Sequence, residues 1–143
     1  MGGFERNQIV MSASLNILII DDEPQMCELL SDVLSDHHNV STANDGVRAW
    51  KQISKNPREI DLVFTDINMP MLDGIGLLKR IKQLYPHIGV VLISGAADAE
   101  TAVHGIKQGA YDYLSKPIQR LETIEEMVEN WILDEKTRKQ DDG

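Results

Sequence analysis

Five short apolar runs alternate with amphipathic segments along the chain, and this alternation restricts the fold more than any other feature of the sequence. Each run is rich in aliphatic or β-branched residues and is bounded by turn-forming residues. Such runs are typical of strands buried in a parallel sheet. The predicted strands are Asn16–Ile20, Val40–Ala43, Leu62–Thr65, Gly89–Ile93 and Tyr111–Leu114.

The segment after each run carries apolar residues at helical spacing, which predicts five helices. Pro24 suits the first turn of the first helix, where a missing N–H costs nothing. The next three helices have suitable N-cap residues, which are in turn Asn44 or Asp45, Asp73, and Asp98. The apolar faces are Met26, Leu29, Leu30, Val33 and Leu34; Val47, Trp50 and Ile53; Ile75, Leu78 and Ile81; Ala99, Ala102, Val103 and Ile106; and Leu121, Ile124, Val128, Trp131 and Ile132.

Strict alternation of strands and helices implies right-handed crossovers and a parallel sheet covered by helices on both faces. We therefore predict an α/β fold of the flavodoxin-like, doubly wound (βα)5 type, with a five-stranded parallel sheet in the order 2-1-3-4-5. The 143 residues suit about one domain. We place this domain at residues 15–133, after a flexible leader at 1–14 and before a charged C-terminal tail or linker at 134–143.

Polar side chains stand at the ends of four of the predicted strands. Asp21 and Asp22 follow the first strand, Asp66 the third, Ser94 the fourth, and Lys116 comes after the fifth. Parallel strands end at one edge of a sheet, where the strand order reverses between strands 1 and 3 and ligands bind. We therefore expect these five side chains to converge at that edge.

This set of groups suits phosphoryl transfer. Three carboxylates at one edge need a counter-charge, which Mg²⁺ supplies while leaving room for waters and a phosphate oxygen. Lys116 adds a positive charge and Ser94 a hydroxyl donor, and a carboxylate can attack phosphorus to form an aspartyl-phosphate.

Each residue, taken alone, also has a structural explanation. Asp66 would cap a turn, and Asp21–Glu23 would be the acidic first turn of a helix, favoured by its dipole. Ser94 would end a strand, Lys116 would be a solvated loop residue, and Tyr113 a half-buried strand aromatic. We expect all four histidines to lie on the surface. The placement of every polar group after a predicted strand favours a functional site.

The set Asp21-Asp22, Asp66, Ser94 and Lys116-Pro117 resembles the receiver domain of two-component response regulators. The segment at 66–74, DINMPMLDG, is similar to the phosphorylation loop of that family, and the resemblance covers roughly residues 16–133. It implies that Asp66 accepts the phosphoryl group. It also implies that Mg²⁺ is held by Asp22 directly, by Asp21 through water, by Asp66 and by the Asn68 backbone carbonyl.

The resemblance further implies that Lys116 contacts the phosphoryl group, that Ser94 stands where the family has Ser or Thr, and that Tyr113 is the switch aromatic. It implies a cis Lys116–Pro117 bond. The expected partner is a sensor histidine kinase or phosphotransfer protein, with a phosphorylation-dependent homodimer or a downstream effector as further partners. The expected role is a signalling switch and not an enzyme, since its only chemistry would be self-directed phosphotransfer and autodephosphorylation.

The composition of the chain argues against some classes of binding partner. Asp and Glu number 23 against 14 Lys and Arg, and a formal charge of -9 disfavours binding to nucleic acid or an anionic membrane. We expect no basic patch, and no apolar run approaches the length of a membrane span. The single cysteine, Cys27, cannot form an internal disulfide, which suits a cytoplasmic protein.

The sequence argues against three other functions. A phosphatase of the haloacid dehalogenase kind needs a second acid two residues after its nucleophile, where this chain has Asn68, which cannot shuttle a proton. A flavodoxin-like cofactor binder needs a phosphate loop after strand 1, where Asp21-Asp22-Glu23-Pro24 would repel phosphate. A receiver-like module that is never phosphorylated would not need the complete set of site residues.

Overall fold

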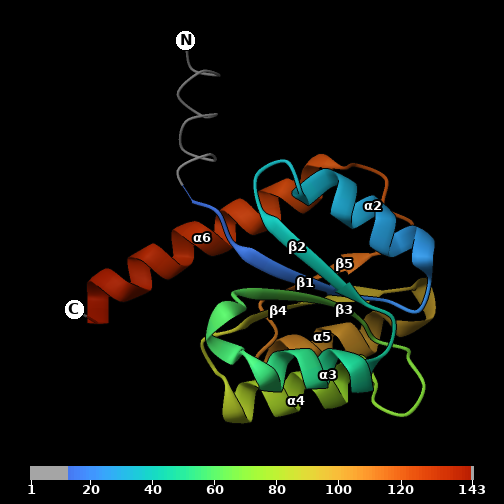
Figure 1. Cartoon of the computed structure of the whole chain (residues 1–143). Coiled ribbons are helices and arrows are strands. Elements are labelled where there is room, and N and C mark those ends of the chain that lie inside the picture. Colours follow the sequence, from blue (N-terminus) through green and yellow to red (C-terminus); the bar gives the residue numbers. More distant parts are fainter. Residues whose placement is uncertain (1–12, 143) are drawn as a thin grey trace.

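The structure is a computed structural model that describes residues 13–142, with the side chains of 141 and 142 left out (Figure 1). All but two residues of the expected leader at 1–14 therefore lie outside the described residues. The five strands form one parallel sheet in the order β2-β1-β3-β4-β5, which confirms the predicted topology. They are β1 (Asn16–Ile20), β2 (Asn39–Ala43), β3 (Leu62–Asp66), β4 (Gly89–Ser94) and β5 (Asp112–Ser115).

Helices cover both faces of the sheet, so the molecule has three layers (Figure 1). One face is covered by α2 and α6, and the other by α3, α4 and α5. The helices are α2 (Pro24–Leu34), α3 (Gly46–Lys55), α4 (Gly74–Leu84), α5 (Ala99–Lys107) and α6 (Glu122–Asp142), with short 3-10 helices η1 (Pro57–Glu59) and η2 (Ala96–Asp98). No helix in the described part of the chain is both long and apolar enough to cross a membrane.

The core consists of two apolar clusters, one on each face of the sheet, because successive strand side chains point to opposite faces. In β1, Ile17 and Ile19 pack under α2 and α6, whereas Leu18 and Ile20 pack under α3, α4 and α5. Every residue of β3 and β4 is buried. These two interior strands are thus packed on both faces, and they carry Asp66 and Ser94 as their last residues.

The expected apolar face of α5 is only partly correct. Ala102 is buried, but Ala99, Val103 and Ile106 are exposed. The helix packs on the sheet through its small residues: a Cβ built on Gly105 would lie 2.3 Å from Leu92 Cδ1 of β4. Close approach through small residues leaves the larger aliphatic side chains of α5 facing outward.

Three other expectations differ from the structure. Leu121 is exposed and precedes α6, so it does not belong to the apolar face of that helix; α6 itself continues through residues 134–142. His38 is buried, not on the surface, and its Nδ1 accepts a hydrogen bond from the Leu15 N–H at 3.0 Å. Asp98 forms no side-chain cap on α5, since its carboxylate binds elsewhere.

Candidate functional site

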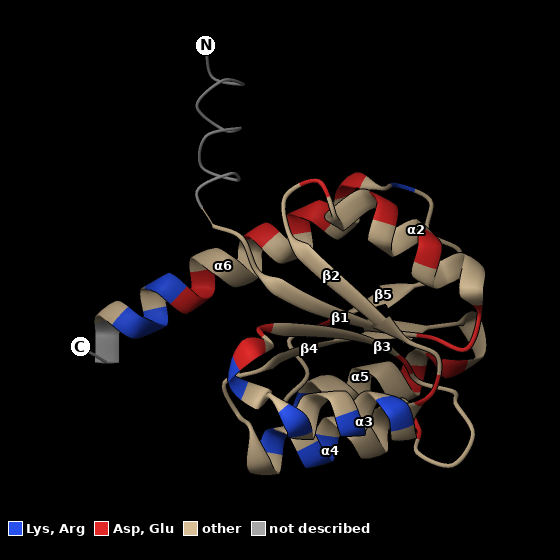
Figure 2. Cartoon of the chain, viewed as in Figure 1, with Lys and Arg blue, Asp and Glu red and all other residues tan. Residues whose placement is uncertain are grey.

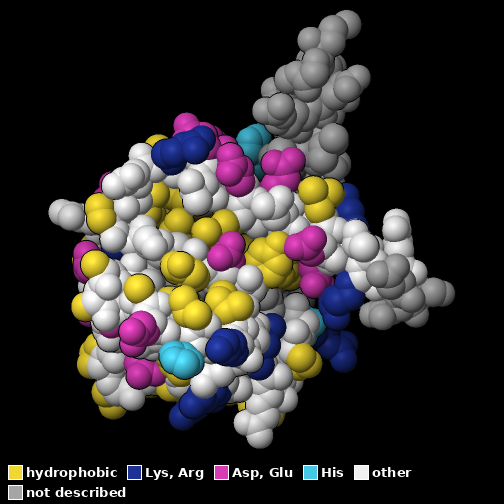
Figure 3. Space-filling view, turned by 180° about the vertical axis from the view of Figure 1, so that it is seen from behind, with side chains coloured by type: hydrophobic (Ala, Val, Ile, Leu, Met, Phe, Trp, Pro, Cys, Tyr) yellow, Lys and Arg dark blue, Asp and Glu magenta, His cyan; other side chains and the backbone are white. Residues whose placement is uncertain are grey.

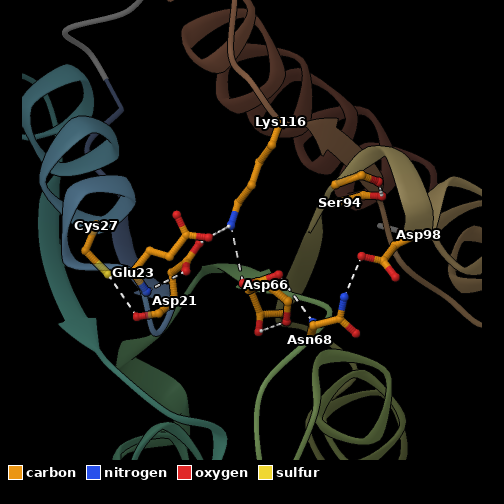
Figure 4. Close-up of polar contacts among 10 residues, drawn as sticks. Asp21, Glu23, Cys27, Asp66, Asn68, Ser94, Asp98 and Lys116 are labelled. Carbon is orange, nitrogen blue, oxygen red and sulfur yellow. Dashed lines mark hydrogen bonds and ion pairs between the residues drawn. The ribbon is translucent and has the colours of Figure 1, made fainter.

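The predicted residues meet at the carboxyl edge of the sheet (Figure 4). Asp21 follows β1, Asp66 ends β3, Ser94 ends β4, and Lys116 follows β5. The loop after β3 fits closely against its own strand, because a Cβ on Gly74 would lie 2.3 Å from the Asp66 carbonyl oxygen. Glycine at the start of α4 therefore lets this loop fold back beside Asp66.

Lys116 joins three carboxylates across this edge. Its Nζ lies 3.1 Å from Asp21 Oδ2, 3.0 Å from Glu23 Oε1 and 3.3 Å from Asp66 Oδ2. Burial alone would lower the pKa of Lys116, but its contacts with the Glu23 and Asp21 carboxylates raise that pKa above its ordinary value. The ammonium is therefore charged at neutral pH and offsets the negative charge gathered around it.

Asp21 lies deepest in the site and is fully buried. Its Oδ1 accepts a hydrogen bond from the Glu23 N–H at 2.9 Å. Burial, the Glu23 N–H, the Asp66 charge and Lys116 together bring the pKa of Asp21 to about 6; burial and the Asp66 charge raise it, and the Glu23 N–H and Lys116 lower it. Asp21 Oδ2 is ion-paired with Lys116 but accepts no well-directed hydrogen bond, so it can still bind a second cation.

Four carboxylates are close enough to share one metal ion. Asp21, Asp22, Glu23 and Asp66 each offer an oxygen, and these oxygens lie within 4.8 Å of one another. Asp21 and Asp66 are buried, while Asp22 and Glu23 are exposed, so waters can complete a coordination shell. Oxygen ligands with access to solvent suit a hard divalent cation such as Mg²⁺.

Asn68 connects the loop after β3 to the loop after β4. Its backbone N–H donates to Asp66 Oδ1 at 3.3 Å, and its side-chain amide donates to Asp98 Oδ2 at 2.5 Å (Figure 4). This second bond explains why Asp98 does not cap α5 as the sequence predicts. The two loops that border Asp66 are therefore tied together through side chains.

Ser94 and Tyr113 do not contact Asp66 in this structure. Ser94 is buried, and its hydroxyl donates to the Gly95 carbonyl at 3.0 Å. Tyr113 is half-buried against the apolar cluster beneath α3, α4 and α5. Both side chains would have to rotate to respond to a group added at Asp66. The Lys116–Pro117 bond is cis, as the family resemblance implies.

Two residues of the site had no role assigned from the sequence. Glu23 pairs with Lys116, and Asp98 receives the Asn68 amide. Glu23 continues the acidic run after β1, so the sequence indicates where it lies along the chain. The sequence does not indicate that its side chain points toward Lys116. Asp98 stands 30 residues from Asn68, and no local pattern links the two.

Comparison with known proteins gives the family of the chain. A family profile described as "Response regulator receiver domain" matches residues 17–129. The chain is 41% identical over 106 residues to the transcriptional regulatory protein ZraR of Escherichia coli O157:H7, covering 73% of this chain and 24% of that protein. It is 43% identical over 105 residues to the nitrogen assimilation regulatory protein NtrX of Azorhizobium caulinodans, covering 71% of this chain and 23% of that protein.

Solved structures give the same result. A response regulator receiver domain protein from Clostridium thermocellum has a TM-score of 0.81 at 32% identity, over 86% of this chain and 98% of that one. The receiver domain of NtrX from Brucella abortus has a TM-score of 0.74 at 40% identity, over 80% of this chain and 96% of that one. The chain thus spans about a quarter of the two curated relatives and nearly all of these two solved chains.

Proposed function

We propose that this chain, which belongs to the family of response regulator receiver domains, is a phosphorylation switch with Asp66 as its phosphoryl acceptor. The observation that carries this proposal is the position of Asp66. It ends a central strand, it is largely buried, and its Oδ2 lies 3.3 Å from the Lys116 ammonium. Asp21 has similar contacts but lies deeper, with no exposed surface for a donor to reach.

The phosphoryl donor we propose is the phosphohistidine of a sensor histidine kinase or of a phosphotransfer protein. An Asp66 carboxylate oxygen attacks the phosphorus, a P–O bond forms, and the P–N bond to the donor histidine breaks. The imidazole leaves with the electron pair and takes up a proton. Lys116, already beside Asp66 Oδ2, pairs with the phosphoryl oxygens and keeps its own proton.

The residues present fit a bound Mg²⁺, because Asp21 Oδ2 retains binding capacity among four converging carboxylates. We propose that Asp22 and Asp66 hold the ion, together with Asp21 and the Asn68 backbone carbonyl. When bound, the ion offsets the negative charge that collects on the phosphoryl oxygens. Lys116 would then share with the ion the task of offsetting the negative charge of the carboxylates.

The response to phosphorylation that we propose begins at Ser94. A phosphoryl group adds roughly -1.5 to -2 charges and three acceptor oxygens at Asp66. The Ser94 hydroxyl, which here donates to the Gly95 carbonyl, would turn to one of these oxygens and draw the loop after β4 toward the site. Tyr113 would then rotate inward from its half-buried position on β5.

The surface that would change is formed by α5, β5 and α6. Seen from behind, apolar side chains gather across this side of the molecule (Figure 3). Val103 of α5 is 47% exposed, and Leu121 before α6 is also 47% exposed. Exposed aliphatic residues of this kind suit a protein contact, either a phosphorylation-dependent homodimer or a downstream effector.

The proposed role is that of a cytoplasmic signalling switch and not of an enzyme acting on other substrates. Its only chemistry would be phosphotransfer to itself and loss of that group to water. Incubation with a small acyl phosphate and Mg²⁺, followed by intact mass measurement, tests this role. Wild type should gain one phosphoryl group, while a chain that gains none under any donor would be an interaction module instead.

A further inference from the structure

The helices α3 and α4 carry only positive charge, although the whole chain is acidic (Figure 2). Together they hold six lysines and arginines and no aspartate or glutamate. On the other face of the sheet, α2 and residues 122–133 of α6 hold acidic residues and no lysine or arginine. We call the α3–α4 surface the basic face; its cations are Arg48, Lys51, Lys55, Lys79, Arg80 and Lys82.

The expectation that the chain has no basic patch is therefore wrong. The six cations come from two helices separated in sequence by β3 and its flanking loops, three from each helix. The fold brings α3 and α4 side by side on one face of the sheet. The cations of the two helices form one basic surface only because the helices pack against each other.

Most of these cations have no carboxylate partner. Among the described residues, five of them form no ion pair with a carboxylate, and four of these five are exposed: Lys51, Lys55, Lys79 and Arg80. Lys82 differs, because its Nζ donates to the Pro86 and Ile88 carbonyls at the end of α4. Like charges on two adjacent helices that lack carboxylate partners repel one another, and an external anion would relieve this repulsion.

Aromatic residues lie between the cations. The Trp50 and Tyr85 rings are 5.8 Å apart, and the Arg80 guanidinium lies 5.6 Å from the Trp50 ring centre. Both rings are half-buried, and Leu84 beside Tyr85 is 56% exposed. Trp, Tyr and Arg are the residues that most often dominate the energetics of protein–protein interfaces.

These features favour an acidic protein over other anionic partners. Nucleic acid binding would bring the phosphate backbone near a chain with a net charge of -9, which repels it at longer range. Stacking of bases needs free ring faces, whereas Arg80 already covers Trp50. Binding in a membrane interface needs a broad apolar face, and Leu84 is the only large hydrophobic residue of α3 and α4 that is strongly exposed.

We propose that the basic face is a docking surface for a protein partner that presents a segment rich in Asp and Glu with an apolar side chain among them. The carboxylates pair with Lys51, Lys55 and Lys79, and the apolar side chain packs beside Trp50 and Tyr85. The cations of this surface come from α3 and α4 and not from α5, β5 or α6, and the surface uses none of the site residues. Docking is therefore independent of the proposed phosphorylation.

A titration with a synthetic helical peptide tests this proposal. The peptide carries Leu and Phe at helical spacing among Glu and Asp residues, and it is added to the full chain while amide NMR shifts and Trp fluorescence are recorded. We expect saturable shifts confined to α3, η1 and α4, and binding that weakens as salt rises from about 50 to about 300 mM. Absence of saturable shifts there, or shifts centred on another surface, would overturn the proposal.

Matched variants show whether the peptide binds this surface specifically or is attracted to any positive charge on the chain. Lys51→Glu/Lys79→Glu reverses two charges on the basic face, and Lys136→Glu/Lys139→Glu makes the same charge change at the end of α6. We expect about tenfold weaker peptide binding for the first pair and less than about twofold for the second. Equal weakening by both pairs would contradict a specific surface, as would tighter binding of duplex DNA or anionic vesicles than of the peptide. Asp66→Asn should bind the peptide as wild type does, whether or not this variant accepts a phosphoryl group.

Discussion

The Asn68 amide donates to the Asp98 carboxylate at 2.5 Å, which joins the loop after β3 to the loop after β4. Asn68 also holds Asp66 through its backbone N–H, so one residue contacts both the proposed acceptor and the loop that follows Ser94. We expect this bond to restrain the loop after β4, and so to favour the unphosphorylated arrangement of the two loops.

The first prediction is that Asp98→Ala makes the switch easier to turn on. Loss of a hydrogen bond worth about 1 kcal/mol should raise the apparent affinity for the phosphoryl mimic beryllofluoride by about fivefold. An NMR titration of the mimic in the presence of Mg²⁺ measures this affinity. Glu100→Ala removes the same charge from the first turn of α5 and should have no effect. An unchanged affinity for Asp98→Ala would show that the bond does not restrain the loops.

The second prediction concerns the Ser94 hydroxyl. Ser94→Ala should still accept a phosphoryl group at Asp66, because its hydroxyl does not contact Asp66 here. The variant should nevertheless respond less in the amide shifts of β5, α5 and α6, since the link between the phosphoryl group and the β4 loop is lost. Ser94→Thr keeps the hydroxyl and should respond as wild type. A full response from Ser94→Ala would exclude the hydroxyl as that link.

The third prediction is that Mg²⁺ binding depends on Asp22. Asp22 is the exposed neighbour of Asp21 in the four-carboxylate cluster, so Asp22→Ala removes a ligand without opening the core. Its Mg²⁺ affinity, measured by calorimetry, should fall on the order of tenfold, or about 1.4 kcal/mol. Asp36→Ala, an exposed residue in the turn after α2, is the control. If both variants bind Mg²⁺ like wild type, the proposed ligand set is wrong.

The fourth prediction is a pH dependence of stability that arises far from the site. Burial lowers the pKa of His38 below its ordinary value, the His37 charge lowers it further, and Nδ1 accepts from the Leu15 N–H. The unfolded chain therefore takes up this proton more readily than the folded one as pH falls below about 6.5. Stability contributed by neutral His38 is full above that pH and is lost below it.

The His38→Gln variant isolates this effect, because the Gln amide oxygen can accept from Leu15 at any pH. Urea unfolding between pH 7 and pH 5 should show a greater loss of unfolding free energy for wild type than for the variant. The difference should be about 1 kcal/mol, the net value of one hydrogen bond. Parallel pH profiles would show that His38 does not contribute.

The positions of the main site residues were predictable because each follows an apolar run. The run Leu62–Thr65 ends in Asp66, and Gly89–Ile93 ends in Ser94, so strand direction alone sets the edge at which they lie. Contacts between side chains from different loops were not predictable. The pairing of Lys116 with Glu23 and of Asn68 with Asp98 depends on loop paths that no periodicity encodes.

Errors on helix faces have a similar cause. The apolar positions of α5 fit two stripes, one with Val103 and Ile106 and one with the small residues Ala102 and Gly105. The stripe of small residues faces β4, because only a residue without a Cβ fits beside Leu92 at position 105. Likewise, α6 continues past Leu133 through polar residues whose local contacts, such as Arg138 with Glu135 at 2.7 Å, support a helix without a buried face.

The final prediction is that the phosphoryl group is found on Asp66 and on no other carboxylate. After incubation with a small acyl phosphate and Mg²⁺, borohydride converts an aspartyl-phosphate to homoserine, and peptide sequencing by mass spectrometry locates it. Homoserine at position 66 in wild type, and at no position in Asp66→Asn, is the expected result. Homoserine at position 21 or 22 in wild type, or equal phosphoryl gain by Asp66→Asn, would contradict the assignment of the acceptor.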